Sequence, residues 1–158
     1  MGDTAAPLSS SAGAPRKPRV QRGQGRRGRL DRVIVGIGVD VADIARLRAS
    51  LARTPALASR LFAESERNQP LRSLASCFAA KEAAAKALGA PAGLRWADAI
   101  LSHDVHGRPV LETHGTVAAV AARLGVTRWH VSISHDAGIC VAMVVAEGCG
   151  QEPGPAAG

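Results

Sequence analysis

The stretch FAAKEAAAKALG, residues 78–89, carries charged side chains at a helical spacing that could bind a metal ion and a phosphate. Glu82 and Lys86 are four residues apart, so a helix places them on one side, where a surface ion pair would be worth about 0.3–0.5 kcal/mol. Phe78 falls on the same side, so the pair follows a bulky apolar residue, and Lys81 lies next to it. One carboxylate with two ammonium groups could instead hold a cation and a phosphate together.

A second candidate is Asp40, which follows two glycines in GIGVD, residues 36–40. The stretch lacks the third glycine of the dinucleotide-binding pattern G-x-G-x-x-G, and a carboxylate at the phosphate-facing turn would repel a pyrophosphate. An acid at the end of a glycine-containing strand is a reasonable ligand for Mg²⁺, which prefers one or two protein carboxylates plus substrate phosphates. A helix-capping role for Asp40 fits the sequence equally well.

The third stretch is HVSISHD, residues 130–136, which alternates as a strand does and contains Ser, His and Asp. A hydrolase using Ser134 and His135 is one interpretation. The chain has no G-x-S-x-G elbow, however, and neighbours on one strand do not generally adopt the geometry of a catalytic triad. A polar strand face that binds a ligand or faces solvent is the favoured interpretation.

The elements that position these residues follow from hydrophobic periodicity and from helix-stop signals such as Gly89. The first expected elements are a strand over 33–39, a helix that begins at its N-cap Asp43 and stops at Thr54-Pro55, and helices over 56–62 and 71–88. They are followed by two strands within 98–113 around a turn at His106-Gly107, a helix over 116–124, and a closing hairpin of 128–135 and 138–147. The order β-ααα-ββ-α-ββ does not alternate regularly, so it predicts one compact α+β domain.

Charge and composition divide the chain into three parts. Residues 1–32 hold eight Lys or Arg against two acidic residues, a net +6 of the total +7, and are rich in Gly, Pro, Ser and Arg. We expect a disordered basic extension over 1–32, the folded domain over 33–147 and a flexible tail over 148–158. A nucleic-acid or acidic-partner binding protein acting through the basic extension is the alternative function, although the domain itself is nearly neutral and nucleic acid is not the expected partner.

The core and the cellular location also follow from composition. Aromatic residues make up 3% of the chain and Tyr is absent, so small aliphatic side chains fill a thin core that would gain from oligomerisation.

The three cysteines are widely spaced and form no C-x-x-C pair, which favours a reducing cytoplasm over a disulfide or zinc framework. No apolar run approaches the ~20 residues of a membrane span, so we expect a cytoplasmic protein with no membrane partner.

Taken together, the three stretches resemble the holo-acyl-carrier-protein synthase family, the small 4'-phosphopantetheinyl transferases. The resemblance rests on GIGVDVADIARL (36–47), FAAKEAAAKALG (78–89), GRPVL (107–111) and HVSISHD (130–136) in this order, and it covers about 33–147. It implies transfer of the phosphopantetheine arm of coenzyme A to a serine of an apo acyl-carrier protein, with release of adenosine 3',5'-bisphosphate and with Mg²⁺ as cofactor. It also implies a homotrimer, and it leaves open whether the carrier serves fatty-acid or polyketide synthesis.

The resemblance also implies roles for individual residues. The implied metal ligands are Asp40 and Glu82; the implied catalytic residues are Glu82 and Lys86; the implied coenzyme A contacts are Lys81, Lys86, Gly89, Pro109, Ser134 and His135; and the implied carrier-docking residues are Arg46 and Arg53. Either Glu82 or a nearby water could accept the serine proton. One departure is Cys77, which stands before Phe78 where members commonly have arginine, so a cation for the nucleotide phosphates is missing. Either a lower coenzyme A affinity or compensation by another arginine is expected.

Overall fold

The structure is a computed structural model that describes residues 31–149. Residues 1–30 of the predicted N-terminal extension and 150–158 of the predicted C-terminal tail lie outside the described residues. The elements are β1 (Arg32–Asp43), α1 (Ile44–Arg53), α2 (Ala56–Leu61), α3 (Leu71–Ala87), η1 (Trp96–Asp98), β2 (Ala99–His103), β3 (Pro109–Thr113), α4 (Gly115–Arg123), β4 (Val126–Asp136) and β5 (Ile139–Cys149). The predicted α+β class and element order are confirmed, and the short 3₁₀ helix η1 is the one described element that was not predicted.

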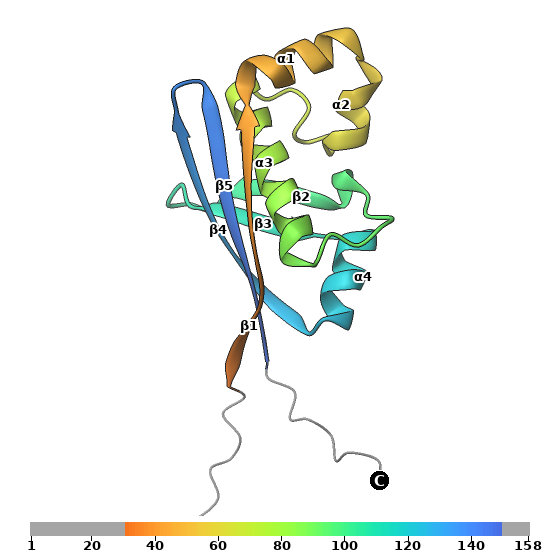
Figure 1. Cartoon of the computed structure of the whole chain (residues 1–158), viewed down its shortest axis with the longest axis vertical. Coiled ribbons are helices and arrows are strands. Elements are labelled where there is room, and N and C mark those ends of the chain that lie inside the picture. Colours follow the sequence, from red (N-terminus) through yellow and green to blue (C-terminus); the bar gives the residue numbers. More distant parts are fainter. Residues whose placement is uncertain (1–30, 150–158) are drawn as a thin grey trace, which may run out of the picture.

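The long strands form a three-stranded antiparallel sheet in the order β1-β5-β4, and β2 and β3 form a separate hairpin. The first strand is longer than the predicted 33–39, because β1 pairs with β5 from Arg32↔Cys149 to Asp43↔Ile139. The same pairing extends the ordered strands one residue before 33 and two residues beyond 147. Figure 1 shows α3 lying against the sheet, with α1 and α2 near one end of it and α4 near the other.

Helix α3 packs directly against β1 because both elements present very small residues at the contact. A Cβ atom at Gly36 would collide with the carbonyl oxygen of Ala87, and one at Gly38 would collide with that of Ala83. Ala83 and Ala87 of this contact are buried, as are Ala79, Ala80 and Ala84 of the same helix. The glycines of GIGVD therefore serve close helix–strand packing, and the alanines of FAAKEAAAKALG are core residues.

We expect Gly38→Ala to lower the free energy of unfolding by about 3 kcal/mol, because the new methyl group meets main-chain atoms of α3 that cannot rotate away. Urea denaturation at a fixed protein concentration measures this. The matched control is Gly107→Ala, where a Cβ meets nothing within 4 Å and only the positive φ of 76° is strained, at a cost of about 1–2 kcal/mol. Equal losses for the two variants would contradict the proposed role of the close contact.

No helix among the described residues is long and apolar enough to cross a membrane.

Candidate active site

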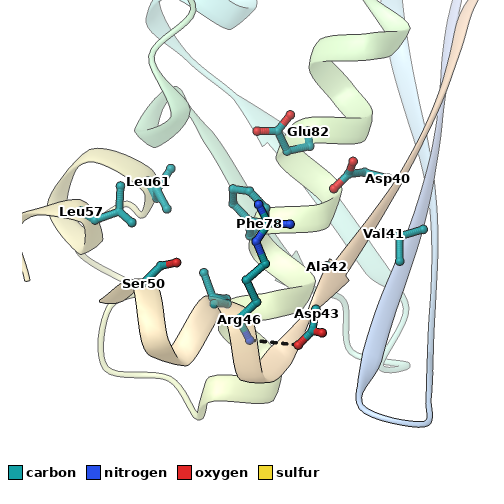
Figure 2. A pocket seen from close by; sticks show the side chains of 11 residues that line it. Asp40, Val41, Ala42, Asp43, Arg46, Ser50, Leu57, Leu61, Phe78 and Glu82 are labelled. Atoms are coloured by element: carbon teal, nitrogen blue, oxygen red, sulfur yellow. Dashed lines mark hydrogen bonds between the residues drawn. The ribbon is translucent and has the colours of Figure 1, made fainter. Parts of the chain in front are cut away.

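Two carboxylates from segments far apart in the sequence meet at one pocket. Asp40 comes from β1 and Glu82 from α3, and both line a cavity of about 370 Å³, here called the carboxylate pocket. Figure 2 shows both side chains projecting into the same space, with the ring of Phe78 next to them. The remaining lining residues are Val41, Ala42, Asp43, Arg46, Leu47, Ser50, Leu57 and Leu61. The pocket thus has one acidic end and one apolar end.

Lys86 makes its ion pair with Asp40 and not with Glu82 on its own helix. Its Nζ donates to Asp40 Oδ1 at 2.7 Å and to the carbonyl oxygen of Val39 at 3.0 Å. The hydrogen bond to Asp40 raises the pKa of Lys86. Burial raises the pKa of Glu82, and the nearby negative charge of Asp40 raises it further. The two carboxylates therefore repel each other, and a cation between them would relieve the repulsion.

The donor set fits Mg²⁺ held partly by protein and partly by substrate. Within residues 31–149 no group of three or more His, Cys, Asp or Glu side chains could hold a metal ion. Mg²⁺ does not require such a group, because it keeps several waters and commonly binds one or two carboxylates plus substrate phosphates. Asp40 and Glu82 supply two carboxylates, and Lys86 places a positive charge beside them where a phosphate would lie.

The start of α1 is fixed by Asp43. The Asp43 side chain accepts a hydrogen bond from the backbone N–H of Arg46 at 2.9 Å, so Asp43 is the N-cap of α1, as predicted. The capping alternative for Asp40 is therefore wrong, because the N-cap lies three residues later. Arg46 lines the carboxylate pocket from α1, and Arg53 lies in the last turn of the same helix.

A second pocket contains Pro109 and His135, two of the residues implied to contact coenzyme A. This cavity of about 340 Å³, here called the histidine pocket, is lined by Ser76, His103, Gly107, Pro109, Val131, Ser132, Ile133 and His135. Ser134 is exposed and His135 partly buried, because neighbouring residues of a strand alternate between faces. The pair Ser134–His135 therefore cannot form a hydrolase dyad, and Ser134 is not among the residues lining this pocket.

Lys81 does not belong to the site. Its side chain is buried, and its Nζ donates to Glu66 Oε2 at 2.5 Å and to the carbonyl oxygens of Leu61 at 2.9 Å and Trp96 at 3.1 Å. The same ammonium group lies 5.6 Å from the centre of the Phe62 ring. Burial lowers the pKa of Lys81, while the bond to Glu66 opposes this effect. All three protons of the ammonium group have partners inside the protein, so the expected contact with coenzyme A is wrong.

Glu66 was missed because nothing in the sequence marks it. It is fully buried, and it also accepts hydrogen bonds from the backbone N–H groups of Ala63 at 2.8 Å and Leu101 at 3.0 Å. The Glu66–Lys81 pair thus joins α3, the loop before it and β2. The only available signal was indirect, because a lysine buried by a helix needs an acidic partner. Glu66 lies fifteen residues before Lys81 and in a loop, so the sequence did not identify it as that partner.

Cys77 also faces the interior. Its Sγ lies 4.0 Å from Gln69 Oε1, and burial, followed by the charge of Glu66, raises its pKa to about 12. Cys77 is 1% exposed, and it lines neither the carboxylate pocket nor the histidine pocket. Gly89 is exposed with a φ of 81°, and its N–H donates to the carbonyl of Lys86 at 3.0 Å at the end of α3.

Comparison with known proteins identifies the family. A model described as the 4'-phosphopantetheinyl transferase superfamily matches residues 36–142. A holo-acyl-carrier-protein synthase of Streptomyces coelicolor is 60% identical over 121 residues, which cover 73% of this chain and 98% of the relative. One from Renibacterium salmoninarum is 57% identical over 115 residues, covering 73% and 99% of the two chains.

Solved structures agree with these relatives. The holo-acyl-carrier-protein synthase of Neisseria meningitidis superposes with a TM-score of 0.65 at 30% identity, covering 72% of this chain and 98% of that one. The enzyme of Helicobacter pylori in complex with coenzyme A superposes with a TM-score of 0.62 at 30% identity, covering 70% and 98%. The matched segment includes Asp40, Glu82, Lys86 and His135. The chain therefore belongs to the 4'-phosphopantetheinyl transferase superfamily and, within it, to the holo-acyl-carrier-protein synthases.

Proposed function

We propose that this chain transfers the phosphopantetheine arm of coenzyme A to a serine of an apo acyl-carrier protein with the aid of Mg²⁺ held by Asp40 and Glu82, and that it releases adenosine 3',5'-bisphosphate. The transfer is the activity of the family to which the chain belongs. The observation that supports the metal and its ligands is the meeting of Asp40 and Glu82 at one pocket, with Lys86 paired to Asp40. Asp40 is more than forty residues away in sequence from the two residues of α3.

The reaction demands little covalent work from the protein. A serine oxygen attacks the β-phosphorus of coenzyme A, and the bond to the leaving phosphate breaks, so rate depends on alignment and on neutralising phosphate charge. Bound Mg²⁺ supplies the Lewis acid for that charge. Lys86 adds a positive charge that stabilises the leaving phosphate, and Glu82 is within the same pocket as a candidate acceptor of the serine proton.

The nucleotide of coenzyme A is assigned to the histidine pocket, where Pro109 and His135 lie together. Gly89 remains a predicted contact: it is exposed, it follows the helix turn that carries Lys86, and its lack of a side chain allows close approach of a ligand. Ser134 faces the opposite side of the sheet from His135, so it could contact coenzyme A only where a second copy of the chain brings the nucleotide to that side.

A second copy is supported by the outer face of the three-stranded sheet. Ile37, Val39, Val41 and Met143 are 57%, 47%, 55% and 43% exposed, and Val39 is paired with Met143 in the sheet register. Contiguous exposed apolar side chains of this kind mark an interaction surface. We assign this face to a homotrimer, and light scattering tests it: a mass three times 16.2 kDa supports the trimer, and a monomer overturns it.

Helix α1 is assigned to carrier docking. Arg46 and Arg53 are exposed on it, and Arg46 also lines the carboxylate pocket, so an acidic carrier bound here would bring its serine to the metal ligands. We expect Arg46→Glu to raise the KM for the carrier by about tenfold, because a charge reversal costs about 1.4 kcal/mol of binding. Steady-state kinetics at low and high salt measures this, and the effect should shrink at high salt.

The control for Arg46→Glu is Arg123→Glu, the same reversal at an exposed residue in the last turn of α4. It should leave the KM for the carrier unchanged. If both reversals raise KM equally, overall charge and not a docking helix governs association, and the assignment of α1 fails.

The transfer itself is tested by incubating the chain with coenzyme A, Mg²⁺ and apo carrier proteins and by measuring the intact mass of each carrier. We expect the phosphopantetheine adduct with Mg²⁺ and its loss when the metal is chelated. Absence of the adduct on every carrier, under conditions where a reference transferase forms it, overturns the proposal. Transfer that survives chelation overturns the role of the metal only.

A further inference from the structure

Lys81 binds the end of α2 from inside the protein. Its Nζ donates to the carbonyl oxygen of Leu61 at 2.9 Å, and Leu61 is the last residue of α2. The last carbonyls of a helix have no partner within the helix, and the helix dipole favours a cation at this end. Lys81 and its partner Glu66 are 2% and 0% exposed, so solvent does not compete for these bonds. The ammonium group is therefore a fixed attachment point for α2.

Helix α2 depends on its neighbours for its position. It has six residues, too few for a helix that is stable by itself. No side chain caps its first turn, and Leu61 is its one fully buried residue. Glu66 extends the attachment, because its Oε2 accepts from Lys81 and from the backbone N–H of Ala63, two residues after the end of α2. The ion pair thus fixes the last carbonyl of α2 and the chain that follows it.

Helix α2 also forms one wall of the carboxylate pocket. Leu57 and Leu61 line the apolar end, and Figure 2 shows them on the opposite side of the pocket from Asp40. Arg46 of α1 lines the same pocket. A carrier that docks on α1 and presents its serine to the metal ligands lays the serine-bearing segment over this apolar end. The position of α2 therefore sets the width of the space into which that segment fits.

The acidic end of the pocket is positioned by a different contact. Gly36 and Gly38 of β1 lie against main-chain atoms of Ala87 and Ala83 in α3, and α2 takes no part in this contact. A change at the Lys81–Glu66 pair should therefore move the apolar wall and leave Asp40 and Glu82 in place. This makes a role in positioning distinguishable from a general loss of structure.

We propose that Lys81, held by Glu66, is a positioning residue for carrier binding: it fixes α2 so that Leu57 and Leu61 form the wall against which the serine-bearing segment of the carrier binds. This rests on the proposed function, which places the carrier on α1 and its serine at the metal ligands. Lys81 touches neither substrate and acts through the carbonyl of Leu61. Its loss should weaken carrier binding and leave the binding of coenzyme A and of the metal unchanged.

Two variants separate positioning from stability. Glu66→Gln removes a charge but keeps an oxygen for Lys81, so the bond to Leu61 should remain and the KM for the carrier should not change, although stability falls. Lys81→Met combined with Glu66→Gln removes the donor to Leu61 without leaving an unpaired charge. The KM for the carrier should then rise about tenfold, equivalent to losing part of one apolar contact. The KM for coenzyme A, kcat and Mn²⁺ binding should stay the same.

Hydrogen exchange measured by mass spectrometry on the same chains gives a readout without turnover. The amides of α2 should exchange faster in the double variant than in Glu66→Gln. The amides of α4, near the other end of the sheet, serve as the reference for overall stability. Titration of a labelled apo carrier without coenzyme A gives its Kd, so a chain that fails the transfer assay can still be tested.

The outcomes distinguish this proposal from the proposed function. Equal losses of carrier affinity in Glu66→Gln and in the double variant make Lys81 a residue of stability only, and the proposal is wrong. It is also wrong if α2 exchanges no faster in the double variant, or if the KM for coenzyme A rises while that for the carrier does not. An unmodified chain that binds the carrier but transfers nothing overturns the proposed transfer and leaves the exchange and the Kd to decide the role of Lys81.

Discussion

Replacing Glu82 with glutamine should lower the rate of phosphopantetheine transfer by about 10³-fold or more, because one of only two carboxylates proposed to hold the metal is lost and the metal supplies several kcal/mol of transition-state stabilisation. Stability should be unchanged or slightly higher. Glutamine keeps the size of the side chain, and the negative charge that Asp40 opposes is removed. Intact-mass rate measurements, together with thermal denaturation of the same samples, check both parts.

The control for this variant is Glu64→Gln, an exposed glutamate outside both pockets, which should transfer at the rate of the unmodified chain. Binding of Mn²⁺ followed by electron paramagnetic resonance gives a readout independent of turnover, and Glu82→Gln should weaken it. If transfer by Glu82→Gln stays near the unmodified rate, Glu82 is not a metal ligand. If transfer is lost but Mn²⁺ binding is intact, Glu82 acts on the proton and not on the metal.

Replacing Lys81 with methionine should lower the free energy of unfolding by about 3–5 kcal/mol, because it leaves the buried carboxylate of Glu66 without its counter-charge. The carbonyls of Leu61 and Trp96 would lose their donor as well. Since small domains are stable by about 5–15 kcal/mol, the variant should be close to unfolding at 37 °C. Urea denaturation at a fixed protein concentration measures the loss.

Lys86→Met is the matched control, because it makes the same exchange five residues later in the same helix, at a side chain that is 49% exposed. It should change stability little, because exposed ion pairs contribute little, while transfer falls because the phosphate loses its cation. The double variant Lys81→Met with Glu66→Gln should recover part of the lost stability by removing the unpaired charge. A stable Lys81→Met chain with a raised KM for coenzyme A would restore the contact with substrate that the sequence suggested.

The sequence was informative wherever the signal was local. Hydrophobic periodicity and stop signals placed all the helices and strands of the described region except η1, and Asp43 was correctly identified as the cap of α1. Part of the site could also be predicted from the sequence, because the charged side chains of Asp40, Glu82 and Lys86 are conspicuous beside apolar neighbours. The structure brings these three together, as a shared role in one site requires.

Contacts between side chains that are far apart in the sequence could not be predicted from it. Lys81 is one residue from Glu82 on the same helix, but a rotation of about 100° per residue directs it into the core and not into the pocket. Its partner Glu66 is 15 residues away in sequence. The side chains of Ser76 and His135 lie 2.9 Å apart, but these residues are separated by 59 positions. No local sequence pattern connects either pair. At Cys77 the departure from the family pattern was evident from the sequence, but the burial of the side chain was not. The cytoplasmic location and the role of the basic extension stay predictions.

The contact of Gly36 and Gly38 with α3 has a consequence for how freely this chain can evolve. Asp40 lies two residues after Gly38, and Glu82 directly precedes Ala83, whose carbonyl Gly38 faces. The separation of the two carboxylates is therefore set by main-chain atoms and hardly at all by the bulk of neighbouring side chains. Drift elsewhere in the core can alter stability without moving these ligands, whereas any side chain larger than hydrogen at Gly38 alters their spacing directly. Gly36 and Gly38 are therefore the positions in this contact at which substitution most directly moves the two carboxylates.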